Sequence, residues 1–426
     1  MKTRLAALLS VVLIASACMS TGSPGSAADI SLARADVPRA SATPGDAAAA
    51  SSAINAFGLD LYRALANGKT NVVLSPASIA LGLGMARAGA RGQTATEMDA
   101  VMRSLGSDEN AGWPNALDQA LATRSGSFKD ASGEDRTVTL RIANAPFAQR
   151  DMPIEQAYLN ALASRYGAGL QLVDYKTATE QARNSINGWV DGQTEHRINE
   201  LLAPGVLTQD SRLTLINAIY LKAPWLTPFL QMDTKAGRFT RTDGSTVDIP
   251  MMAATESLGY AAGSGWRAVE VPYIGGSLAM TVIVPDDLTT FEKTLSADQL
   301  DSITNGLADN QVTLFLPKFS IETKAELGHV LAALGMPTAF SDTADFSGIT
   351  TGEQLQISEI IHQANIDVEE AGTEASASTA VGLREVGRPL SQVTVNVDRP
   401  FLFALRDVPT GAILFMGRVA DPSITR

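Results

Sequence analysis

Residues 369–390 read E-E-A-G-T-E-A-S-A-S-T-A-V-G-L-R-E-V-G-R-P-L, and this stretch decides how the rest of the chain is interpreted. It begins with two glutamates, contains a run of small residues from Ala375 to Ala380, and ends in a varied sequence with two arginines. It has too few large apolar side chains to anchor a hydrophobic core. Composition alone therefore favours an exposed loop or a linker.

The order of the residues adds that this loop is also suited to become a strand. Alternate side chains of an extended chain point to opposite faces. One face would carry only small or β-branched side chains, and the other would carry side chains that tolerate solvent. The first set is Thr373, Ala375, Ala377, Thr379 and Val381; the second is Glu374, Ser376, Ser378, Ala380 and Gly382. A sheet can accept the first set without burying a charge.

Strand-like sequences lie on both sides of this loop. Residues 361–368, I-H-Q-A-N-I-D-V, precede it, and residues 397–422 supply two apolar runs around a Pro-Thr-Gly turn. A linker would join domains, whereas this segment lies between strands just short of the C-terminus. The hinge pattern E-x-G-T-E-A and the closing R-P-F-L-F…G-x-I-L-F-M-G-R-V together resemble the serpin family of protease inhibitors.

The resemblance covers roughly residues 51–422 and implies a fold and a function. The implied fold is α+β, with a large central β-sheet, additional sheets, eight or nine helices and an exposed reactive centre loop. The implied function is suicide inhibition of serine proteases, and also of cysteine proteases: the loop is cut, the protease is held as an acyl-enzyme, and the cut loop enters the main sheet. The alternative is a non-inhibitory serpin that acts as a binding or chaperone-like protein, but the small hinge residues favour the inhibitor.

The same resemblance implies roles for individual residues. Lys318 would pair with Glu370, and His362 would lie beside Asn217 and Ser78 in a cluster that joins two central strands. Breaking such a buried cluster costs about 1–3 kcal/mol per unpaired group. The hinge would comprise Glu370, Gly372, Thr373, Glu374, Ala375, Ser376, Ala377, Ser378 and Thr379. The residues that keep the sheet closed would be Asn71, Ser75, Ser78, Asn217, Trp225, Lys318 and His362.

Three bonds in the loop are candidates for cleavage. Counting from the hinge by the usual serpin spacing gives Val386–Gly387, where a small β-branched residue suits a shallow apolar pocket. Arg384 is an alternative that leaves a shorter insertable segment and an acid just after the cut. Arg388 is the other, but the proline after it resists cleavage. The expected targets are therefore elastase- or subtilisin-like enzymes, with trypsin a poor target.

The body of the chain shows regular helix and strand patterns. Apolar residues at helical spacing from Ile54 to Leu65 predict a helix that ends near Asn67. Residues 71–94 read as a short strand followed by a helix that starts at Ser75-Pro76. Further strands are predicted at residues 213–225, within 260–285 and at 312–320. The turn D-F-S-G-I, residues 345–349, is expected near the hinge.

The N-terminal 50 residues differ in composition from the body. Residues 1–17 have the positive end, short apolar run and small residues of a signal peptide. Cys18, the only cysteine, stands where a bacterial lipoprotein is lipidated; an ordinary secretory leader is the alternative. Residues 18–50 would be a disordered tether and residues 51–426 the folded domain. We expect a cell-envelope or extracellular protein, lipid-anchored at the outer membrane or in the periplasm.

Composition and motifs argue against several classes of function. The net charge of −12 argues against nucleic acid as a partner. Three histidines lie on separate predicted elements and no cysteine follows Cys18, so neither a metal cluster nor a cofactor is expected. No G-x-S-x-G motif appears, and we expect no enzymatic activity. The expected partner is a protease, and the expected state is a monomer.

Overall fold

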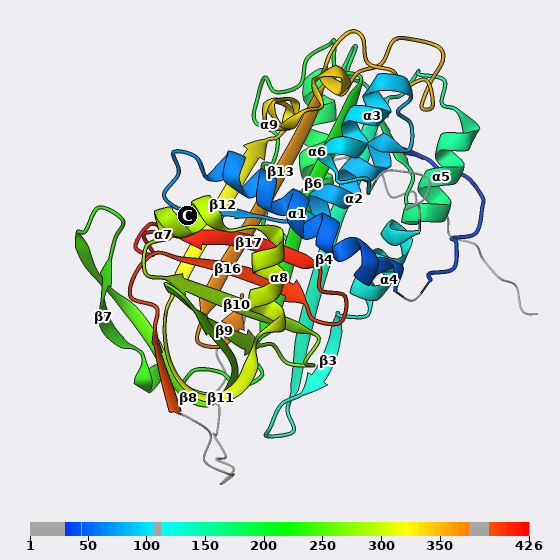
Figure 1. Ribbon diagram of the computed structural model, residues 1–426. Helices are drawn as coiled ribbons and strands as arrows, with labels where there is room; N and C mark the ends of the chain where they lie inside the picture. The colour runs from blue at the N-terminus through cyan, green and yellow to red at the C-terminus, as the bar shows by residue number, and fades with distance from the viewer. Residues whose placement is uncertain (1–29, 44, 106–111, 375–391, 426) are drawn as a thin grey trace, which may run out of the picture.

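Two β-sheets and the helices that cover them form the computed structural model, which describes residues 30–43, 45–105, 112–374 and 392–425 (Figure 1). The described residues include nine α-helices and two large sheets, which confirms the α+β architecture expected from the sequence. The helices are α1 (Asp46–Ala66), α2 (Pro76–Arg87), α3 (Gly92–Val101), α4 (Trp113–Ala122), α5 (Gln156–Tyr166), α6 (Thr179–Gln193), α7 (Leu288–Thr294), α8 (Ala297–Asn305) and α9 (Gly328–Leu334), with short 3-10 turns η2 (Gln231–Asp233) and η3 (Pro337–Phe340). None of the described helices is long and apolar enough to cross a bilayer.

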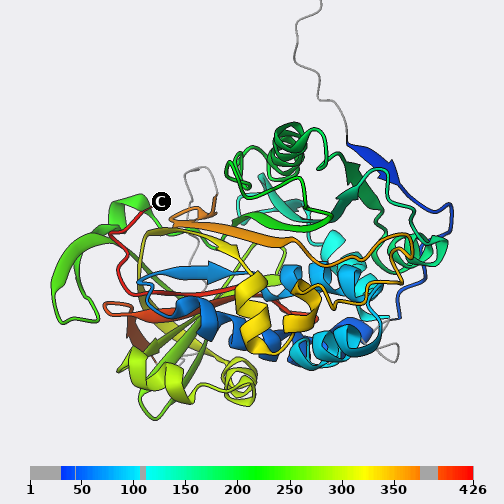
Figure 2. The same ribbon diagram turned by 90° about the horizontal axis from the view of Figure 1, so that it is seen from above.

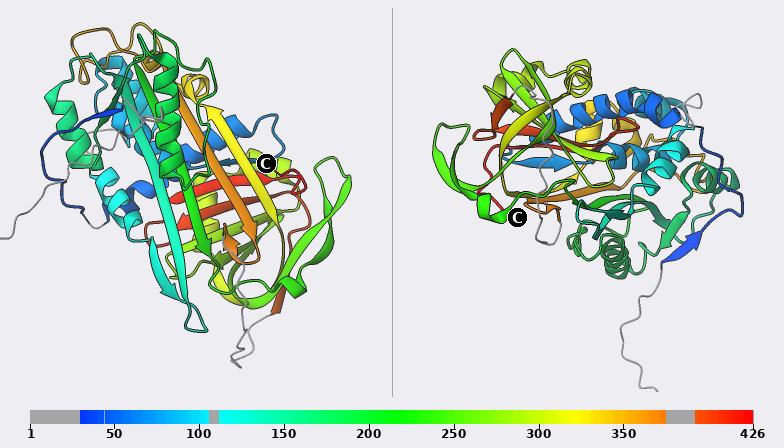
Figure 3. Two further views of the ribbon diagram at one scale, coloured as in Figure 1. Left: turned by 180° about the vertical axis from the view of Figure 1, so that it is seen from behind. Right: turned by 90° about the horizontal axis from the view of Figure 1, so that it is seen from below.

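The main sheet has eight strands in the described residues. Its order is β1 (Ser31–Ala33), β5 (Leu170–Val173), β4 (Asp135–Gln149), β6 (Leu213–Pro224), β14 (Gly372–Thr373), β13 (Glu359–Glu369) and β12 (Phe319–Glu326), with β3 (Gly126–Lys129) beside β4. Figure 3, left, shows β12 in yellow, β13 in orange and β6 in green side by side. The strands predicted at residues 213–225 and 361–368 are thus neighbours in one sheet.

The second sheet has nine strands in the part of the chain that the structure describes. Its order is β15 (Gln392–Asn396), β11 (Ala308–Pro317), β8 (Thr246–Gly263), β9 (Trp266–Pro272), β10 (Leu278–Pro285), β16 (Phe401–Asp407), β17 (Ile413–Val419) and β2 (Val72–Leu74), with β7 (Lys235–Thr240) beside β8. The single strand expected at residues 312–320 is in fact two. The chain leaves the second sheet after Pro317 and enters the main sheet at Phe319, which places Lys318 at the junction.

Helices α2 and α6 cover opposite faces of the main sheet. Helix α2 starts as the sequence predicts: Ser75 Oγ accepts a hydrogen bond from Ser78 N at 3.3 Å, and Pro76 opens the helix. Its small residues allow a close approach, because a Cβ at Gly82 would lie 3.5 Å from Asn217 Nδ2. Helix α6 crosses the other face (Figure 3, left), where its apolar side chains pack on β4, β6 and β13 in a second core cluster that includes Phe147, Ile186, Val190, Ile216 and Ile361.

Strand β6 has two unlike neighbours. It pairs with β4 in antiparallel fashion over ten residue pairs, from Thr139–Lys222 to Ala148–Leu213. It pairs with β13 in parallel over six pairs, from Thr214–Glu359 to Ile219–Ala364. Beyond Ile219 the short strand β14 lies between β6 and β13, antiparallel to both. We call the β6–β13 junction the seam, its end at β14 the hinge end, and its end at Leu213 the far end.

The segment before α1 differs from the disordered tether expected up to residue 50. From residue 30 on, β1 pairs with the edge strand β5 (Figure 2), and Ala40 N donates to Ser164 O of α5 at 3.0 Å. The Arg39 guanidinium binds Asn115 and Asp118 of α4, both at 2.6 Å. An open strand edge offers backbone hydrogen bonds whatever the side chains are, and so a segment poor in apolar residues is held there.

The turn at residues 345–349 also lies elsewhere than expected. Gly348 N donates to Gly89 O at 3.0 Å, and Ile349 O accepts from Glu155 N at 2.8 Å. These contacts belong to the far end of the seam, because the chain runs from this turn through Glu353 to the start of β13. The turn is therefore at the opposite end of β13 from the hinge.

Candidate functional site

The hinge end of the seam is already partly filled by the chain that leads into the loop. After β13 the chain turns at Glu370–Ala371, and Gly372 and Thr373 pair with Pro224 and Ala223 of β6. Gly372 has a φ of 148°, and a Cβ there would lie 2.2 Å from Ala223 O, so no other residue fits without displacing β6. The sequence places the first inward-facing hinge residue at Thr373, and its side chain is indeed buried.

Two aromatic residues surround this first inserted residue. Thr373 Oγ1 lies 2.6 Å from the hydroxyl of Tyr273, which is buried, and burial raises the pKa of that hydroxyl. The Tyr273 ring stacks on Trp225 with centroids 4.4 Å apart. Trp225 in turn donates from Nε1 to Glu369 O at 2.9 Å and from its backbone N to Ala371 O at 3.0 Å. Trp225 therefore holds the turn before the loop, next to the entry into the sheet.

The ion pair expected between Lys318 and Glu370 is present. Lys318 Nζ lies 2.9 Å from Glu370 Oε2, and Thr234 Oγ1 donates to Glu370 Oε1 at 2.9 Å. Burial raises the pKa of Glu370, but the hydrogen bonds from Lys318 and Thr234 outweigh burial and leave the pKa below its usual value. Glu370 is therefore ionised at neutral pH. The neighbouring Glu369 is more exposed and lies 3.9 Å from Lys318 Nζ.

Glu374 differs from the sequence prediction, which places it on a solvent-tolerant face. Its side chain is only 2% exposed, and Arg197 Nε lies 3.2 Å from its Oε2. Arg197 belongs to the segment after α6, which covers the seam at this point; Asn365 of β13 donates to Arg197 O at 3.5 Å. Alternation along one strand cannot reveal a covering segment that is 177 residues distant in the chain, and this is why the prediction was wrong.

A buried polar cluster joins the middle of the seam to α2. His362 of β13 lies opposite Asn217 of β6, and its Nδ1 hydrogen-bonds to Asn217 Oδ1. Asn217 Nδ2 donates to Ser78 Oγ at 2.8 Å and to Asn144 Oδ1 at 2.5 Å. On the other side of the imidazole, Nε2 accepts from Ser75 N at 3.2 Å. The structure thus brings together four of the residues that the sequence assigns to the closed sheet: Ser75, Ser78, Asn217 and His362.

The protonation state of His362 follows from its surroundings. The ring is fully buried, and burial lowers its pKa from 6.5 to about 3. The ring is therefore neutral at pH 7. Because Nε2 accepts a hydrogen bond from a backbone N–H, the single ring proton is on Nδ1 and is donated to Asn217. The position of this one proton therefore determines which group donates and which accepts in the hydrogen bond between His362 and Asn217.

Two further residues change the expected set. Asn71 lies outside the cluster: its Oδ1 accepts from Ala420 N and Asp421 N, and its Nδ2 donates to Asp421 O at 2.7 Å, which ties β2 to the end of β17. Asn144 of β4 was missed by the sequence analysis, although it bonds to both Asn217 and Ser78. The signal available was a lone asparagine between alanines in the otherwise apolar run of residues 142–148.

Several predicted residues lie outside the described ranges. These are Cys18 and the signal peptide, the hinge residues Ala375, Ser376, Ala377, Ser378 and Thr379, and the candidate cleavage residues Arg384, Val386, Gly387 and Arg388. Within the ranges that are described, no group of three or more histidine, cysteine, aspartate or glutamate residues is arranged to hold a metal ion.

Comparison with known proteins gives one consistent result. Residues 52–422 match the protein-family model described as Serpin (serine protease inhibitor). An uncharacterized serpin-like protein of Thermococcus kodakarensis is 37% identical over 87% of this chain and 85% of its own length. Leukocyte elastase inhibitor A of Rattus norvegicus is 36% identical over 67% of this chain and 78% of its own. The crystal structure of Serpin48, from the insect Tenebrio molitor, has a TM-score of 0.75 and 30% identity, over 87% of this chain and 98% of that one.

Proposed function

Because this chain belongs to the serpin family, we propose that it is a suicide inhibitor of serine proteases of the elastase or subtilisin type. The family model is described as one of serine protease inhibitors and not of enzymes, and the expected lack of enzymatic activity follows from that membership. One observation carries the proposal. Gly372 and Thr373 already occupy the first positions of a new strand between β6 and β13, directly before the segment that the sequence identifies as the reactive loop.

The register of β14 defines where the rest of the loop would go after cleavage. Thr373 lies opposite Ala223, and each further residue of an antiparallel strand moves one residue back along β6. Ten further residues bring Leu383 opposite Leu213, the first residue of β6. A segment that ends at Val386 is therefore long enough to fill the whole seam. The attached protease would be carried from the hinge end to the far end.

Insertion is favoured by the change in strand pairing. The seam is now a parallel pairing of six residue pairs, whereas an inserted strand would be antiparallel to both neighbours. Antiparallel pairing is slightly more stable per residue, and a central strand forms ladders on both edges. At about 1 kcal/mol net per hydrogen bond, the gain is on the order of 10 kcal/mol. The uncleaved fold is then a trapped state that persists for kinetic reasons.

Three contacts described above would keep the uncleaved seam closed. The cluster around His362 and Asn217 joins its middle, and the Lys318–Glu370 pair fixes the turn before the loop. Arg197 lies over the point where Glu374 leaves the sheet. The cluster and Arg197 must move before the loop can advance beyond Thr373, whereas the Lys318–Glu370 pair can stay in place and anchor the turn. We assign to these residues the role of delaying insertion until the loop has been cut.

The bond proposed for cleavage is Val386–Gly387. A small β-branched residue suits the shallow pocket of elastase-like enzymes, and the glycine after it allows close approach of the enzyme. Arg384 and Arg388 are the alternatives for trypsin-like enzymes. A relative of this chain is named a leukocyte elastase inhibitor, which agrees with the first choice.

The proposal is tested by incubating the protein with pancreatic elastase, subtilisin and trypsin in parallel. We expect a complex with elastase or subtilisin that survives SDS, together with release of a C-terminal peptide that begins at Gly387. Elastase with a blocked active-site serine is the control and should give neither. Cleavage of the loop by all three enzymes without any stable complex would contradict inhibition and favour the binding or chaperone-like alternative.

We also propose, from the sequence alone, that the mature chain is held at the cell envelope by a lipid on Cys18. A lipid anchor would place the inhibitor at the outer membrane or in the periplasm. Cys18→Ser should move the protein from the membrane fraction to the soluble fraction of the producing cells. An unchanged distribution would contradict the anchor but not the inhibitory function.

A further inference from the structure

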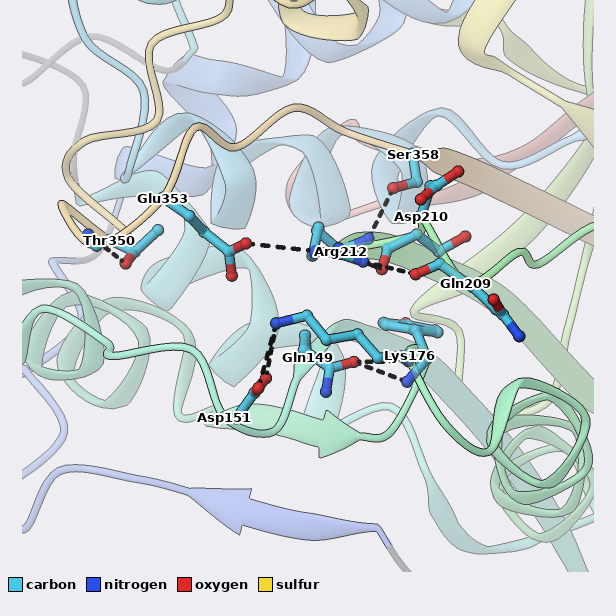
Figure 4. A network of polar contacts seen from close by, with 12 residues as sticks. Gln149, Asp151, Lys176, Gln209, Asp210, Arg212, Thr350, Glu353 and Ser358 are labelled. Atoms are coloured by element: carbon cyan, nitrogen blue, oxygen red, sulfur yellow. Dashed lines mark hydrogen bonds and ion pairs between the residues drawn. The ribbon is translucent and has the colours of Figure 1, made fainter.

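The far end of the seam is closed by contacts of Arg212 (Figure 4). Its backbone N donates to Ser358 Oγ at 3.0 Å, and its Nε lies 3.3 Å from Glu353 Oε2. Ser358 N donates in return to Leu213 O at 2.8 Å. Leu213 begins β6 and Arg212 directly precedes it, whereas Glu353 and Ser358 belong to the segment that leads into β13. These three hydrogen bonds and ion pairs therefore cross the seam where the two strands start.

The Arg212 side chain is held in place by backbone carbonyls of the turn that precedes β6. Its Nη1 donates to Gln209 O at 2.8 Å and to Ser211 O at 2.9 Å, both in the turn before β6. The guanidinium is thus fixed on the β6 side, and its Nε is directed at Glu353 on the other side. Both side chains are partly exposed, 23% for Arg212 and 31% for Glu353. The pair is therefore of moderate strength, and water can reach it when it opens.

A second set of contacts at the same end does not cross the seam. Gln149 N donates to Arg212 O at 3.1 Å, and Gln149 Oε1 accepts from Tyr175 N at 2.8 Å and Lys176 N at 3.2 Å. Lys176 Nζ lies 3.2 Å from Asp151 Oδ2. These contacts join β6, β4 and the segment after β5 into one unit (Figure 4). At the far end, the contacts among β4, β5 and β6 form one stable unit, whereas the contacts of Arg212 across the seam can be released.

Complete insertion of a strand would break the contacts that cross the seam between β6 and the segment before β13. Neighbouring strands lie about 4.8 Å apart, so β6 and β13 would be separated by roughly 9.6 Å once a strand lies between them. Hydrogen bonds of 2.8–3.3 Å cannot persist at that separation. Contacts between Gln149, Lys176 and Asp151 can persist, because they lie within the unit formed by β4, β5 and β6.

We propose that Arg212, Glu353 and Ser358 form a latch that controls the last step of loop insertion. The inference rests on the proposed inhibitory function and adds to it the residues that govern the final step. The hinge contacts delay the start of insertion, whereas the latch delays its completion. During that delay the acyl-enzyme still has time to hydrolyse and release an active protease. A weaker latch therefore traps more protease, although it makes the uncleaved protein less stable.

The test compares the double variant Glu353→Gln/Ser358→Ala with the control Asp151→Asn. Thermal midpoints are measured for the uncleaved and the cleaved full-length chain, and complex yield is measured with a protease that the wild-type chain traps incompletely. We expect the double variant to lower the midpoint of the uncleaved form only, and to speed the last step about two- to fivefold, as for an exposed ion pair. The ratio of trapped to released protease should rise by the same factor. Asp151→Asn should lower both midpoints alike and leave that ratio unchanged.

Two results would overturn the latch. The first is an equal fall of both midpoints in the double variant, which would show that these contacts matter equally after insertion. The second is an unchanged or lower yield of complex. A wild-type chain whose midpoint does not rise on cleavage would instead contradict the proposed function on which the latch rests, so the two failures are distinguishable.

Discussion

The two edges of β6 differ in the direction and the length of their strand pairing. Its edge with β4 has ten antiparallel pairs, and at the far end the buried Gln149 fastens the loop after β5 to β4. Its edge with β13 has six parallel pairs and then gives way to β14. At the first edge the pairing extends over almost the whole strand. At the second, closure depends on a few polar contacts, among them those of His362 and Arg212.

The main sheet can therefore be stable at one edge of β6 and able to open at the other. Parallel pairing over a short length leaves fewer backbone hydrogen bonds to break at the seam. Buried polar groups add directional contacts that are lost together once the strands part, whereas apolar packing weakens gradually. Opening therefore has a barrier, and a new strand can replace what is lost. Changes that act on the β6–β13 edge should therefore have different effects from changes elsewhere in the sheet, and cleavage of the loop should have the largest.

Cleavage anywhere between Leu383 and Leu390 should raise the thermal midpoint. The gain of about 10 kcal/mol from two new ladders corresponds to a rise on the order of 10 °C for a domain of this size. Differential scanning calorimetry on the intact and the cleanly nicked chain measures it. An unchanged or lower midpoint after nicking would mean that the two edges of β6 do not differ in the proposed way.

Thr373→Arg should convert the protein from an inhibitor into a substrate. Thr373 is 1% exposed and its hydroxyl contacts Tyr273, so an arginine there would bury an unpaired charge at a cost of several kcal/mol. Cleavage by elastase should continue, but the yield of covalent complex should fall at least about tenfold. Thr373→Ser keeps the hydroxyl and is the matched control, for which near-normal yields are expected. Full yields with the arginine variant would disprove insertion at this position.

The seam should weaken as the pH falls below 6.5. His362 has a pKa of about 3 in the folded protein against 6.5 when unfolded, so the unfolded chain takes up the proton first. The stabilising contribution is complete above pH 6.5 and decreases by about 1.4 kcal/mol per pH unit between there and pH 3. From pH 7 to pH 5 the free energy of unfolding should therefore fall by about 2 kcal/mol more in the wild type than in His362→Gln.

Urea unfolding of the uncleaved chain at several pH values measures this difference. His196→Gln removes a histidine that is 80% exposed and takes no part in the cluster, and this control variant should leave the cluster intact. Equal slopes for the wild type and His362→Gln would show that His362 does not control the seam through its protonation.

The smallest effect is expected at the hinge turn. Glu370→Gln removes the charge that Lys318 and Thr234 bind, and it should lower the free energy of unfolding by about 1 kcal/mol at pH 7. The pKa of Glu370 is below its usual value of 4.5, so this contribution is present above pH 4.5 and lost as the pH falls further. The difference between the two proteins should shrink as the pH falls below 4.5. Glu369→Gln is the control and should have little effect; equal effects of both would remove Glu370 from the account.

Much of this site could be predicted because its residues carry distinctive local patterns. The small residues after Gly372 predict an insertable strand, and Lys318 and Glu370 stand in short motifs that resemble those of the family. The fold follows from the same motifs together with the helix start at Ser75-Pro76 and the strands around residues 213 and 361. In each case, the information lies within a few neighbouring residues.

The residues that were missed depend on segments distant in the chain. Asn144 reaches the cluster because β4 pairs with β6, and Glu374 is buried because Arg197 and the segment after α6 cover it. Arg212 and Glu353 meet only when the starts of β6 and β13 come together. The segment before α1 is ordered by the edge of β5 and not by its own composition. No local pattern contains these long-range contacts.

The central claim is that the cut loop becomes a strand between β6 and β13. Hydrogen exchange measured by mass spectrometry on the intact and the cleaved chain tests it most directly. We predict that the backbone amides of residues 375–386 exchange rapidly before cleavage and become as protected as those of β4 and β6 afterwards. If these amides still exchange rapidly after clean cleavage at Val386, the loop does not enter the sheet and the account is contradicted.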